Sequence, residues 1–347
     1  MYSVADVVRA TAGIQAQVQS SAEMAIWTRR RGTTREDVRG ALWDTRQLVK
    51  TSAMRNTLHL IPARDFAVYI AAMRPSSMAM LARWHRRIGA TPTQVHALVE
   101  TIVESVADGP RTQQELIARA KKRAGSAIRA WLDHAWSGVR PAVIEGAIVY
   151  GPPRGAAATF VRAESWLGPQ PAPSVDAARA ELLRRFLSAF GPATAHDFAK
   201  WSGLAVGDAR ASLDATRGEL TPVSVAGAPG WILEADAREL AASELDADAV
   251  RLLGPFDSFL LAHATKEHLV SARGYKRVYR PQGWISAAVL RGGQIIGVWT
   301  TRSTGRTMAV DVELFGRASA AVRRAIAREV DELSRFLGAA CVAGFGT

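Results

Sequence analysis

The chain has 347 residues, enough for two or three domains, and its 48% hydrophobic and 22% charged residues are typical of folded proteins, which excludes a disordered chain. Lysine and arginine number 44 against 32 aspartate and glutamate residues, so the formal net charge is +12 and the surface favours polyanionic partners. Cys341 is the only cysteine, which excludes an internal disulfide and a zinc site built from several thiolates.

The expected location follows from two absences in the sequence. No apolar run is long enough to cross a bilayer and the start does not have the pattern of a secretory signal, so we expect a cytoplasmic, nucleoid-associated protein with no membrane partner. Arginine greatly outnumbers lysine, and its forked side chain suits contacts to phosphate and base edges. A GC-rich genome produces the same bias, so composition alone leaves both explanations open.

The first predicted elements are two helices joined by a short connector. Residues 4–12 ("VADVVRATA") have a helical periodicity that Gly13 interrupts. Ser20 and Glu23 have the spacing of a capping box, which would open a second helix over residues 22–31 ("AEMAIWTRRR"). The connector between the helices is therefore predicted to contain Gln15, Gln17 and Gln19.

Gln15 and Gln17 form a candidate pair of amides. In an extended backbone, side chains two residues apart project from the same face, whereas on a helix they diverge by about 200°. An extended connector would therefore present two neutral carboxamides side by side. The alternative is that these glutamines cap backbone groups or face solvent.

A capping-box spacing recurs at intervals of about 80 residues and indicates an internal repeat. The threonines and the acids three residues later are Thr34 and Asp37, Thr112 and Glu115, and Thr194 and Asp197. Each pair is predicted to open a short helix, a turn and a second helix, and a strand or hairpin follows in the first two copies. This order is that of a winged helix, in which one helix enters a DNA groove and the hairpin lies along the backbone.

In the first copy, the segment Met54–Leu60 ("MRNTLHL") is predicted to end in a strand. Period-two alternation there puts the two leucines on a core face and Arg55, Thr57 and His59 on an opposite face rich in hydrogen-bond donors. This face and the preceding "TRRR" segment are expected to line a DNA cleft. The candidate DNA-contacting residues of the region are Arg29, Arg30, Arg55, Asn56, Thr57 and His59.

Joins rich in proline and glycine near "IGATPT" and "GPQPAPS" divide the chain into three predicted units. We expect a first winged-helix unit carrying the glutamines at 1–90, a second at 91–170, and a third at 171–347 that includes C-terminal β-hairpins and a helix. The predicted fold class is α+β, mainly helical. In the β-rich portion, "GWISAAVLRGGQIIGVWTT" predicts a hairpin across the two adjacent glycines, and residues 318–338 predict an amphipathic helix.

A basic segment, Ala272–Trp284 ("ARGYKRVYRPQGW"), is predicted to be a loop suited to phosphate contact and base stacking. Its cations alternate with tyrosines, and the candidate DNA-contacting residues are Arg273, Tyr275, Lys276, Arg277 and Arg280. A solvated basic loop is the alternative. Upstream, Asp257 is expected either to cap a turn or to contribute to a cleft.

Neither a metal nor a cofactor is expected. The seven histidines show no metal-ligand spacing, since His263 and His268 are five residues apart and have no cysteine partner. The sequence also has no phosphate-binding glycine loop and no serine-hydrolase elbow.

The order of motifs resembles that of the AlkZ/YcaQ-like winged-helix DNA glycosylases. The resemblance is carried by "GIQAQ", "LVKTSAMRNTLHLIPARDF", "FGPATAHDFAKWSGL", "RLLGPFDSFLLAH" and "GQIIGVW", which span nearly the whole chain. It implies three tandem winged-helix units forming a C-shaped DNA cleft, with Gln15 and Gln17 as the catalytic motif. Members of the family usually carry a longer segment ahead of this motif, whereas 14 residues precede Gln15 here, so a truncated start or an absent entrance helix is expected.

The resemblance further implies hydrolytic removal of alkylated purines from double-stranded DNA, including nitrogen-7 adducts and interstrand crosslinks. We expect a monofunctional glycosylase that acts as a monomer, and Lys50 is the nearest lysine that could form a Schiff base instead. A purine alkylated at nitrogen-7 already carries positive charge and leaves as a neutral base, so neutral amides suffice to place the water and stabilise the sugar cation. The alternatives are a non-enzymatic winged-helix regulator and, from charge alone, an RNA-binding factor.

Overall fold

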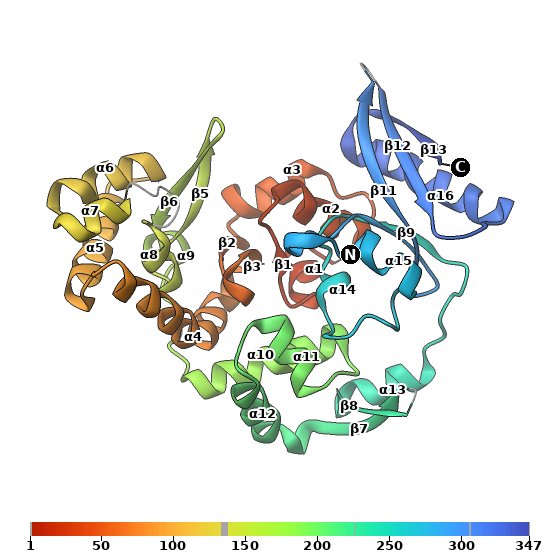
Figure 1. The fold of residues 1–347 in the computed structure, drawn as a ribbon, viewed down its shortest axis with the longest axis horizontal. Helices are drawn as coiled ribbons and strands as arrows, with labels where there is room; N and C mark the ends of the chain where they lie inside the picture. The colour runs from red at the N-terminus through yellow and green to blue at the C-terminus, as the bar shows by residue number, and fades with distance from the viewer. Residues whose placement is uncertain (1, 133–137, 226, 305–306, 347) are drawn as a thin grey trace. The chain divides into compact units, whose positions relative to one another are not determined.

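The computed structural model describes residues 2–132, 138–225, 227–304 and 307–346, and its helices and sheets confirm the predicted α+β class (Figure 1). The chain forms two compact units. Unit 1 comprises Met1–Val38, Phe186–Trp201 and Arg217–Thr347, and unit 2 comprises Arg39–Arg185 and Ser202–Thr216. No helix within the described ranges is both long and apolar enough to cross a membrane.

Unit 1 combines short helices with a five-stranded sheet. Its helices are α1 (Val4–Ala10), α2 (Gln19–Arg29), α3 (Arg35–Arg39), the end of α10 (Val175–Phe190), α11 (Ala195–Ser202), α13 (Glu234–Ala242), α14 (Ser258–Leu261), α15 (Ala272–Val278) and α16 (Ala320–Leu337). Its strands are β1 (Ile14–Gln15), β7 (Leu220–Val225), β8 (Ala228–Leu233), β9 (Val250–Leu253), β10 (Ala288–Arg291), β11 (Gln294–Thr304), β12 (Thr307–Leu314) and β13 (Ala340–Phe345).

The large sheet of unit 1 has the strand order β13-β12-β11-β10-β9. All neighbouring strands are antiparallel except β12 and β13, which are parallel and are connected through α16. The predicted hairpin across Gly292 and Gly293 is confirmed, because both residues have positive φ (50° and 79°) and Arg291 pairs with Gln294. The predicted C-terminal amphipathic helix is also confirmed as α16, which Ser319 caps and Gly338 ends.

Both faces of this sheet are covered (Figure 1). One core packs α2 and α16 against the sheet and includes Trp27, whose ring stacks on Phe336 at a centroid distance of 5.4 Å. The opposite core packs α14 and α15 and includes Leu260, Val278 and Phe315. Alternate residues of β9 and β10 point into the two cores, as period-two geometry requires. The segments around α2 and α14 are thereby fixed to one rigid sheet.

Unit 2 is mainly helical with two hairpins. Its helices are α4 (Phe66–Arg87), α5 (Pro92–Ser105), α6 (Gln113–Arg123), α7 (Ser126–Leu132), α8 (Arg140–Ile144), α9 (Ala163–Leu167), the start of α10 and α12 (Val206–Ala215). Its strands are β2 (Leu48–Ser52), β3 (Leu58–Pro62), β4 (Arg111–Thr112), β5 (Ile148–Arg154) and β6 (Ala157–Arg162). β2 pairs with β3, β5 with β6, and β4 with β6, all antiparallel.

The repeated capping boxes form as predicted. The Asp37 N–H donates to the Thr34 hydroxyl oxygen at 3.1 Å, and the carboxylate of Asp37 accepts from the Thr34 N–H at 2.8 Å. Equivalent reciprocal bonds open α6 at Thr112 and α11 at Thr194. The hairpin of the third copy is present as β7 and β8, so helices are followed by an antiparallel hairpin in every copy.

Candidate active site

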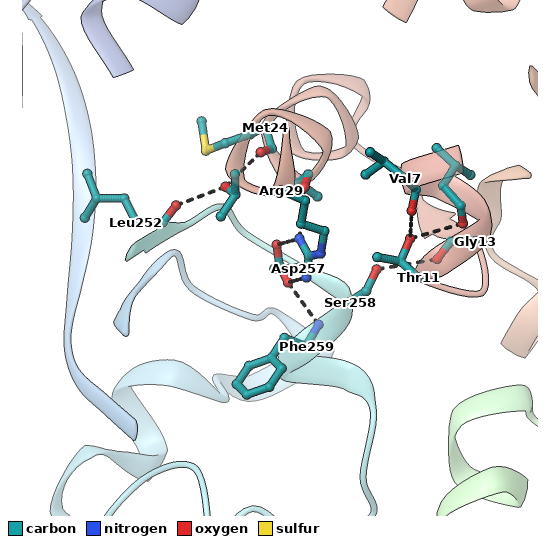
Figure 2. Close-up of polar contacts among 12 residues, drawn as sticks. Val7, Thr11, Gly13, Met24, Arg29, Leu252, Asp257, Ser258 and Phe259 are labelled. Carbon is teal, nitrogen blue, oxygen red and sulfur yellow. Dashed lines mark hydrogen bonds and ion pairs between the residues drawn. The ribbon is translucent and has the colours of Figure 1, made fainter. Parts of the chain in front are cut away.

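The glutamine connector, residues 11–18, follows a helix end that local bonds fix. The Thr11 hydroxyl donates to the carbonyl oxygens of Val7 (3.0 Å) and Val8 (3.1 Å), one turn back in α1 (Figure 2). Gly13 has φ 89°, and its N–H donates to the Val8 carbonyl at 2.9 Å. Glycine adopts this left-handed conformation without strain, so the chain reverses here and leaves α1 in a defined direction.

Burial alternates along the connector. Ile14 and Ala16 are 1% and 0% exposed, whereas Gln15 is half-buried and Gln17 is exposed. The predicted extended backbone is confirmed at Ile14–Gln15, which form β1, and the chain then bends at Gln17. With the apolar pair turned into unit 1, the two amides project from the other side of the connector.

The predicted start of α2 was wrong. The helix begins at Gln19, its N-cap is Val18, and no side chain caps it, so Gln19 belongs to the helix and not to the connector. The predicted capping box does not open the helix, because Ser20 lies inside α2, whose N-cap is Val18, and Glu23 is buried. Its carboxylate instead accepts from the Gln19 amide at 3.4 Å and lies 3.5 Å from the Arg35 guanidinium.

Arg29 and Arg30, predicted to contact DNA, are both engaged within unit 1. Arg29 donates through both terminal nitrogens to the carboxylate of Asp257, at 2.8 and 2.7 Å (Figure 2). Asp257 is fully buried, and although burial acts to lower the pKa of Arg29, the adjacent carboxylate outweighs it and raises that pKa. Arg30 donates to the Tyr2 carbonyl (2.8 Å) and the Thr33 hydroxyl (2.9 Å).

In unit 2, the segment Met54–Asn56 forms a 3₁₀ turn, so the predicted strand was placed too early; β3 begins at Leu58. Arg55 and Asn56 both have positive φ (54° and 57°), a conformation that costs a residue with a Cβ about 1 kcal/mol or more. The turn before α12 lies against it, because a Cβ on Gly203 would come within 2.9 Å of the Arg55 Cα. Burial lowers the pKa of the Arg55 guanidinium to about 10.

His59 is buried, at 2% exposure, and does not present its ring on an open strand face as alternation predicted. Both faces of β3 are covered, which is why period two failed there. Nδ1 of His59 lies 2.9 Å from the Thr57 carbonyl oxygen, which can only accept, so Nδ1 carries the proton and Nε2 is an acceptor. Burial and the charge of Arg55 lower the pKa of His59 to about 3, although the bond to Thr57 opposes them.

The other two predicted DNA contacts of this turn, Thr57 and Asn56, also form hydrogen bonds within unit 2. The Thr57 hydroxyl donates to the Met54 carbonyl at 3.1 Å. The Asn56 carbonyl accepts from Arg140 at 3.4 Å, while no donor among the described residues reaches the buried Asn56 Oδ1. The turn therefore offers a cation and an amide acceptor next to each other.

The basic segment near the C-terminal sheet was predicted to be a loop, and this was wrong: residues Ala272–Val278 form α15. The segment is helical and not a loop because a helix places Gly274 and Val278, four residues apart, on one face, where both are buried against the sheet. Arg273, Lys276 and Arg280 are exposed, and Arg277 is paired with Glu313. Tyr275 is 45% exposed, and its ring lies 5.1 Å from that of Tyr279.

Among the described residues, no group of three histidine, cysteine, aspartate or glutamate side chains is arranged to hold a metal ion. Sequence reasoning missed that Asp257 pairs with Arg29, and it also missed the buried pair of Asp65 and Arg185, at 2.6 Å, in unit 2. The N-cap half of the Asp257 prediction is confirmed, because its Oδ1 accepts from the Phe259 N–H at 2.9 Å. The cap depends on neighbouring residues and could be predicted, whereas the ion-pair partner of Asp257, Arg29, is 228 residues away in the sequence.

Comparison with known proteins places this geometry in a wider group. The family described as "DNA glycosylase AlkZ-like" matches residues 8–336. A Streptomyces sahachiroi protein named "Interstrand DNA cross-link repair glycosylase" is 35% identical over 306 residues, which are 86% of this chain and 82% of that protein. The solved structure of Streptomyces sahachiroi DNA glycosylase AlkZ is similar with a TM-score of 0.88 and 29% identity, covering 100% of this chain and 94% of its own.

Proposed function

The chain belongs to the AlkZ-like DNA glycosylase family, an enzyme family that acts on DNA, and we propose that it hydrolyses the N-glycosidic bond of nitrogen-7-alkylated purines with Gln15 and Gln17 as the catalytic residues. One observation carries the proposal. Ile14 and Ala16 are buried, whereas Gln15 is half-buried and Gln17 is exposed, and this alternation supports amides that are accessible to a substrate.

The chemistry fits neutral amides. A purine alkylated at nitrogen-7 carries a positive charge, so its bond to the sugar breaks with the electron pair leaving on the base, which becomes neutral. Water adds its oxygen to the anomeric carbon, and its spare proton passes to solvent. One amide oxygen accepts a hydrogen bond from this water, and the other lies near the developing sugar cation. Because an amide is a weak base, unmodified purines are not substrates.

We further propose that the chain binds duplex DNA through three winged-helix units at 1–90, 91–170 and 171–347, which surround a C-shaped cleft. The antiparallel hairpins β2–β3, β5–β6 and β7–β8, one in each range, support this architecture. The net charge of +12 supports binding to a phosphate backbone. The proposed DNA contacts are Arg55, Asn56, Thr57, Arg273, Tyr275, Lys276, Arg277 and Arg280. His59 is buried, and Arg29 and Arg30 are bonded to other groups of unit 1.

A monofunctional reaction that leaves an abasic site is proposed. A bifunctional enzyme needs a free amine that attacks the sugar. Lys50 is the lysine nearest to the motif in sequence, and its ammonium lies 5.6 Å from the centre of the Tyr150 ring within unit 2. The aromatic face stabilises the charged form, which is not nucleophilic.

Interstrand crosslinks are included among the proposed substrates. The Streptomyces sahachiroi relative is named for their repair. A base joined to both strands cannot rotate out of the helix in the usual way. An exposed connector, such as the one that carries Gln17, suits an approach to the anomeric carbon from the groove with the adduct left in place.

The test is base release from a duplex that contains nitrogen-7-methylguanine or a mustard crosslink, followed by cleavage of abasic sites with alkali. Wild type is expected to produce strand breaks, and Gln15→Ala and Gln17→Ala are each expected to lower the single-turnover rate about a hundredfold, the usual contribution of one preorganised polar group. Binding to undamaged duplex serves as the control and is expected to stay within about twofold.

Equal rates for wild type and both variants would remove the site assignment. Tight, salt-dependent binding with no abasic sites would instead favour a non-enzymatic regulator.

A further inference from the structure

The connector that carries the two glutamines is held by one segment of unit 1, Leu252–Phe259, which we call the brace (Figure 2). At the beginning of the connector, the Ser258 hydroxyl donates to the Gly13 carbonyl oxygen at 3.5 Å, and both residues are buried. Gly13 lies directly before the strand that carries Gln15. The brace therefore contacts the backbone two residues from the first amide.

The brace also holds α2, which begins two residues after Gln17. Asp257 accepts two hydrogen bonds from the Arg29 guanidinium, at 2.7 and 2.8 Å, in the last turn of this helix. The preceding Thr28 hydroxyl donates to the Leu252 carbonyl oxygen at 3.3 Å. The brace thus contacts the connector itself at Gly13 and the far end of the helix that follows the connector.

Asp257 joins the two contacts. Its Oδ1 accepts from the Phe259 N–H at 2.9 Å and so caps α14, the single turn that begins with Ser258. Asp257 is 0% exposed, and its carboxylate meets the fork of Arg29 on one side and the helix start on the other. Loss of the carboxylate would therefore release the hydroxyl that reaches the connector as well as the guanidinium that anchors α2.

The backbone around the brace is strained and closely packed. Phe256, directly before Asp257, has φ 58°, and Ala12, directly before Gly13, has φ 50°; neither residue is glycine. A Cβ on Gly254 would lie 2.8 Å from the Met24 sulfur in α2. Strained residues persist where the surrounding contacts overdetermine them, and such positions cluster at functional sites.

We propose that Asp257 is a positioning residue for base excision, which acts through Arg29 and Ser258 to fix the backbone of the glutamine connector. It does not touch the substrate. The inference rests on the proposed function of Gln15 and Gln17. A displacement of about 1 Å in a reacting geometry costs about a hundredfold in rate, so partial release of the connector is expected to cost about tenfold.

The first test compares Asp257→Asn with Asp65→Asn. Both substitutions remove one charge from a buried aspartate that pairs with an arginine through two nitrogens, but Asp65 and its partner Arg185 lie in unit 2, which does not contain the glutamines. Single-turnover release of nitrogen-7-methylguanine is measured with saturating enzyme well below the melting temperature. We expect Asp257→Asn to slow release about tenfold and Asp65→Asn to stay within about twofold, with affinity for undamaged duplex unchanged in both.

The second test removes the hydroxyl alone, which avoids any loss of folding that Asp257→Asn causes. Ser258→Ala is expected to slow release several-fold and Ser258→Thr to restore it, since threonine keeps a hydroxyl at the same position. Ser334→Ala is the matched control, because the Ser334 hydroxyl donates to the Ala339 carbonyl at 2.8 Å elsewhere in unit 1. It is expected to change stability and not the rate.

A double-mutant cycle separates positioning from an independent structural role. If Ser258 acts through the connector, adding Ser258→Ala to a variant that lacks both amides, Gln15→Ala with Gln17→Ala, causes no further loss of rate. Rate losses that multiply in this cycle would overturn the inference while leaving the proposed function intact. Equal rates for Asp257→Asn and Asp65→Asn would do the same. Full activity of Gln15→Ala would instead overturn the proposed function itself.

Discussion

Arg29 and Arg55 lie in different units and are both partly buried, but their surroundings shift their pKa values in opposite directions. At Arg29, burial is outweighed by the Asp257 carboxylate 2.7 Å away, and the pKa is raised. At Arg55, burial alone accounts for a pKa lowered to about 10. Arg29 is paired with a carboxylate of its own unit, whereas burial disfavours the charged form of Arg55.

This difference indicates different uses for the two side chains. A buried cation with a bidentate carboxylate partner is a structural element, and breaking such a pair leaves an uncompensated charge. A cation whose charged form is disfavoured by burial is stabilised by an anionic ligand, because a phosphate replaces the solvation that burial removes. Arg29 is therefore part of the structure of unit 1, and Arg55 remains a proposed DNA contact.

The largest expected effect concerns folding. Asp257→Ala should lower the free energy of unfolding by about 3 kcal/mol or more, because Arg29 then stays buried without its carboxylate. Arg55→Ala should change it by less than about 1 kcal/mol, because the folded state no longer has to hold a poorly solvated charge. Urea unfolding of both variants measures the contrast. Equal losses would show that the two arginines play the same role.

A pH dependence is expected next in size, and it comes from His59 beside Arg55. Its pKa is about 3 in the folded protein against about 6.5 when unfolded, so the unfolded chain binds more protons between these values and stability falls as the pH drops through this range. Relative to pH 7, we expect about 2–3 kcal/mol to be lost at pH 4.5.

The control for this dependence is His59→Gln, whose stability should fall less over the same range. Arg55→Gln should remove part of the dependence, because the charge of Arg55 contributes to the lowered pKa of His59. Parallel stability curves for all three proteins in urea titrations would contradict the assignment.

DNA affinity gives a smaller effect. Arg55→Gln should weaken binding to undamaged duplex about tenfold and lower the slope of log affinity against log salt by about one, as the loss of one phosphate contact requires. Arg29→Gln, by contrast, should leave the salt slope unchanged, provided that the variant folds. Fluorescence anisotropy across a salt series measures both, and a reduced slope for Arg29→Gln would reverse the two roles.

The smallest effects are expected on α15. Arg273→Gln removes an exposed cation and should weaken binding about threefold, whereas Arg277→Gln should matter less because Glu313 already partly neutralises that charge. The same salt series measures these changes. An Arg277 effect larger than that of Arg273 would show that DNA displaces Glu313.

Features with a local cause could be predicted from the sequence. The capping boxes at Thr34, Thr112 and Thr194 depend on side chains three residues apart, and the turn at Gly292 and Gly293 depends on two residues that tolerate positive φ. All of them form as predicted.

Features decided by packing could not be predicted in this way. Ser20 and Glu23 have the spacing of a cap, but the helix begins one residue before Ser20, and the buried carboxylate of Glu23 accepts from the Gln19 side chain. The alternation of residues predicted that His59 lies on an exposed face of its strand, but tertiary contacts cover both faces of β3. The partner of Arg29 lies 228 residues along the chain, so no sequence pattern could identify it.

The central claim is that two uncharged amides suffice because alkylation has already weakened the bond, and leaving-group selectivity tests it most directly. Single-turnover rates are compared for nitrogen-7-methylguanine and for hypoxanthine, an uncharged base, at the same position of one duplex. We expect wild type to release the methylated base and to leave the uncharged base in place. Comparable rates for the two bases would contradict the account, because they would require a stronger acid or base than Gln15 and Gln17 provide.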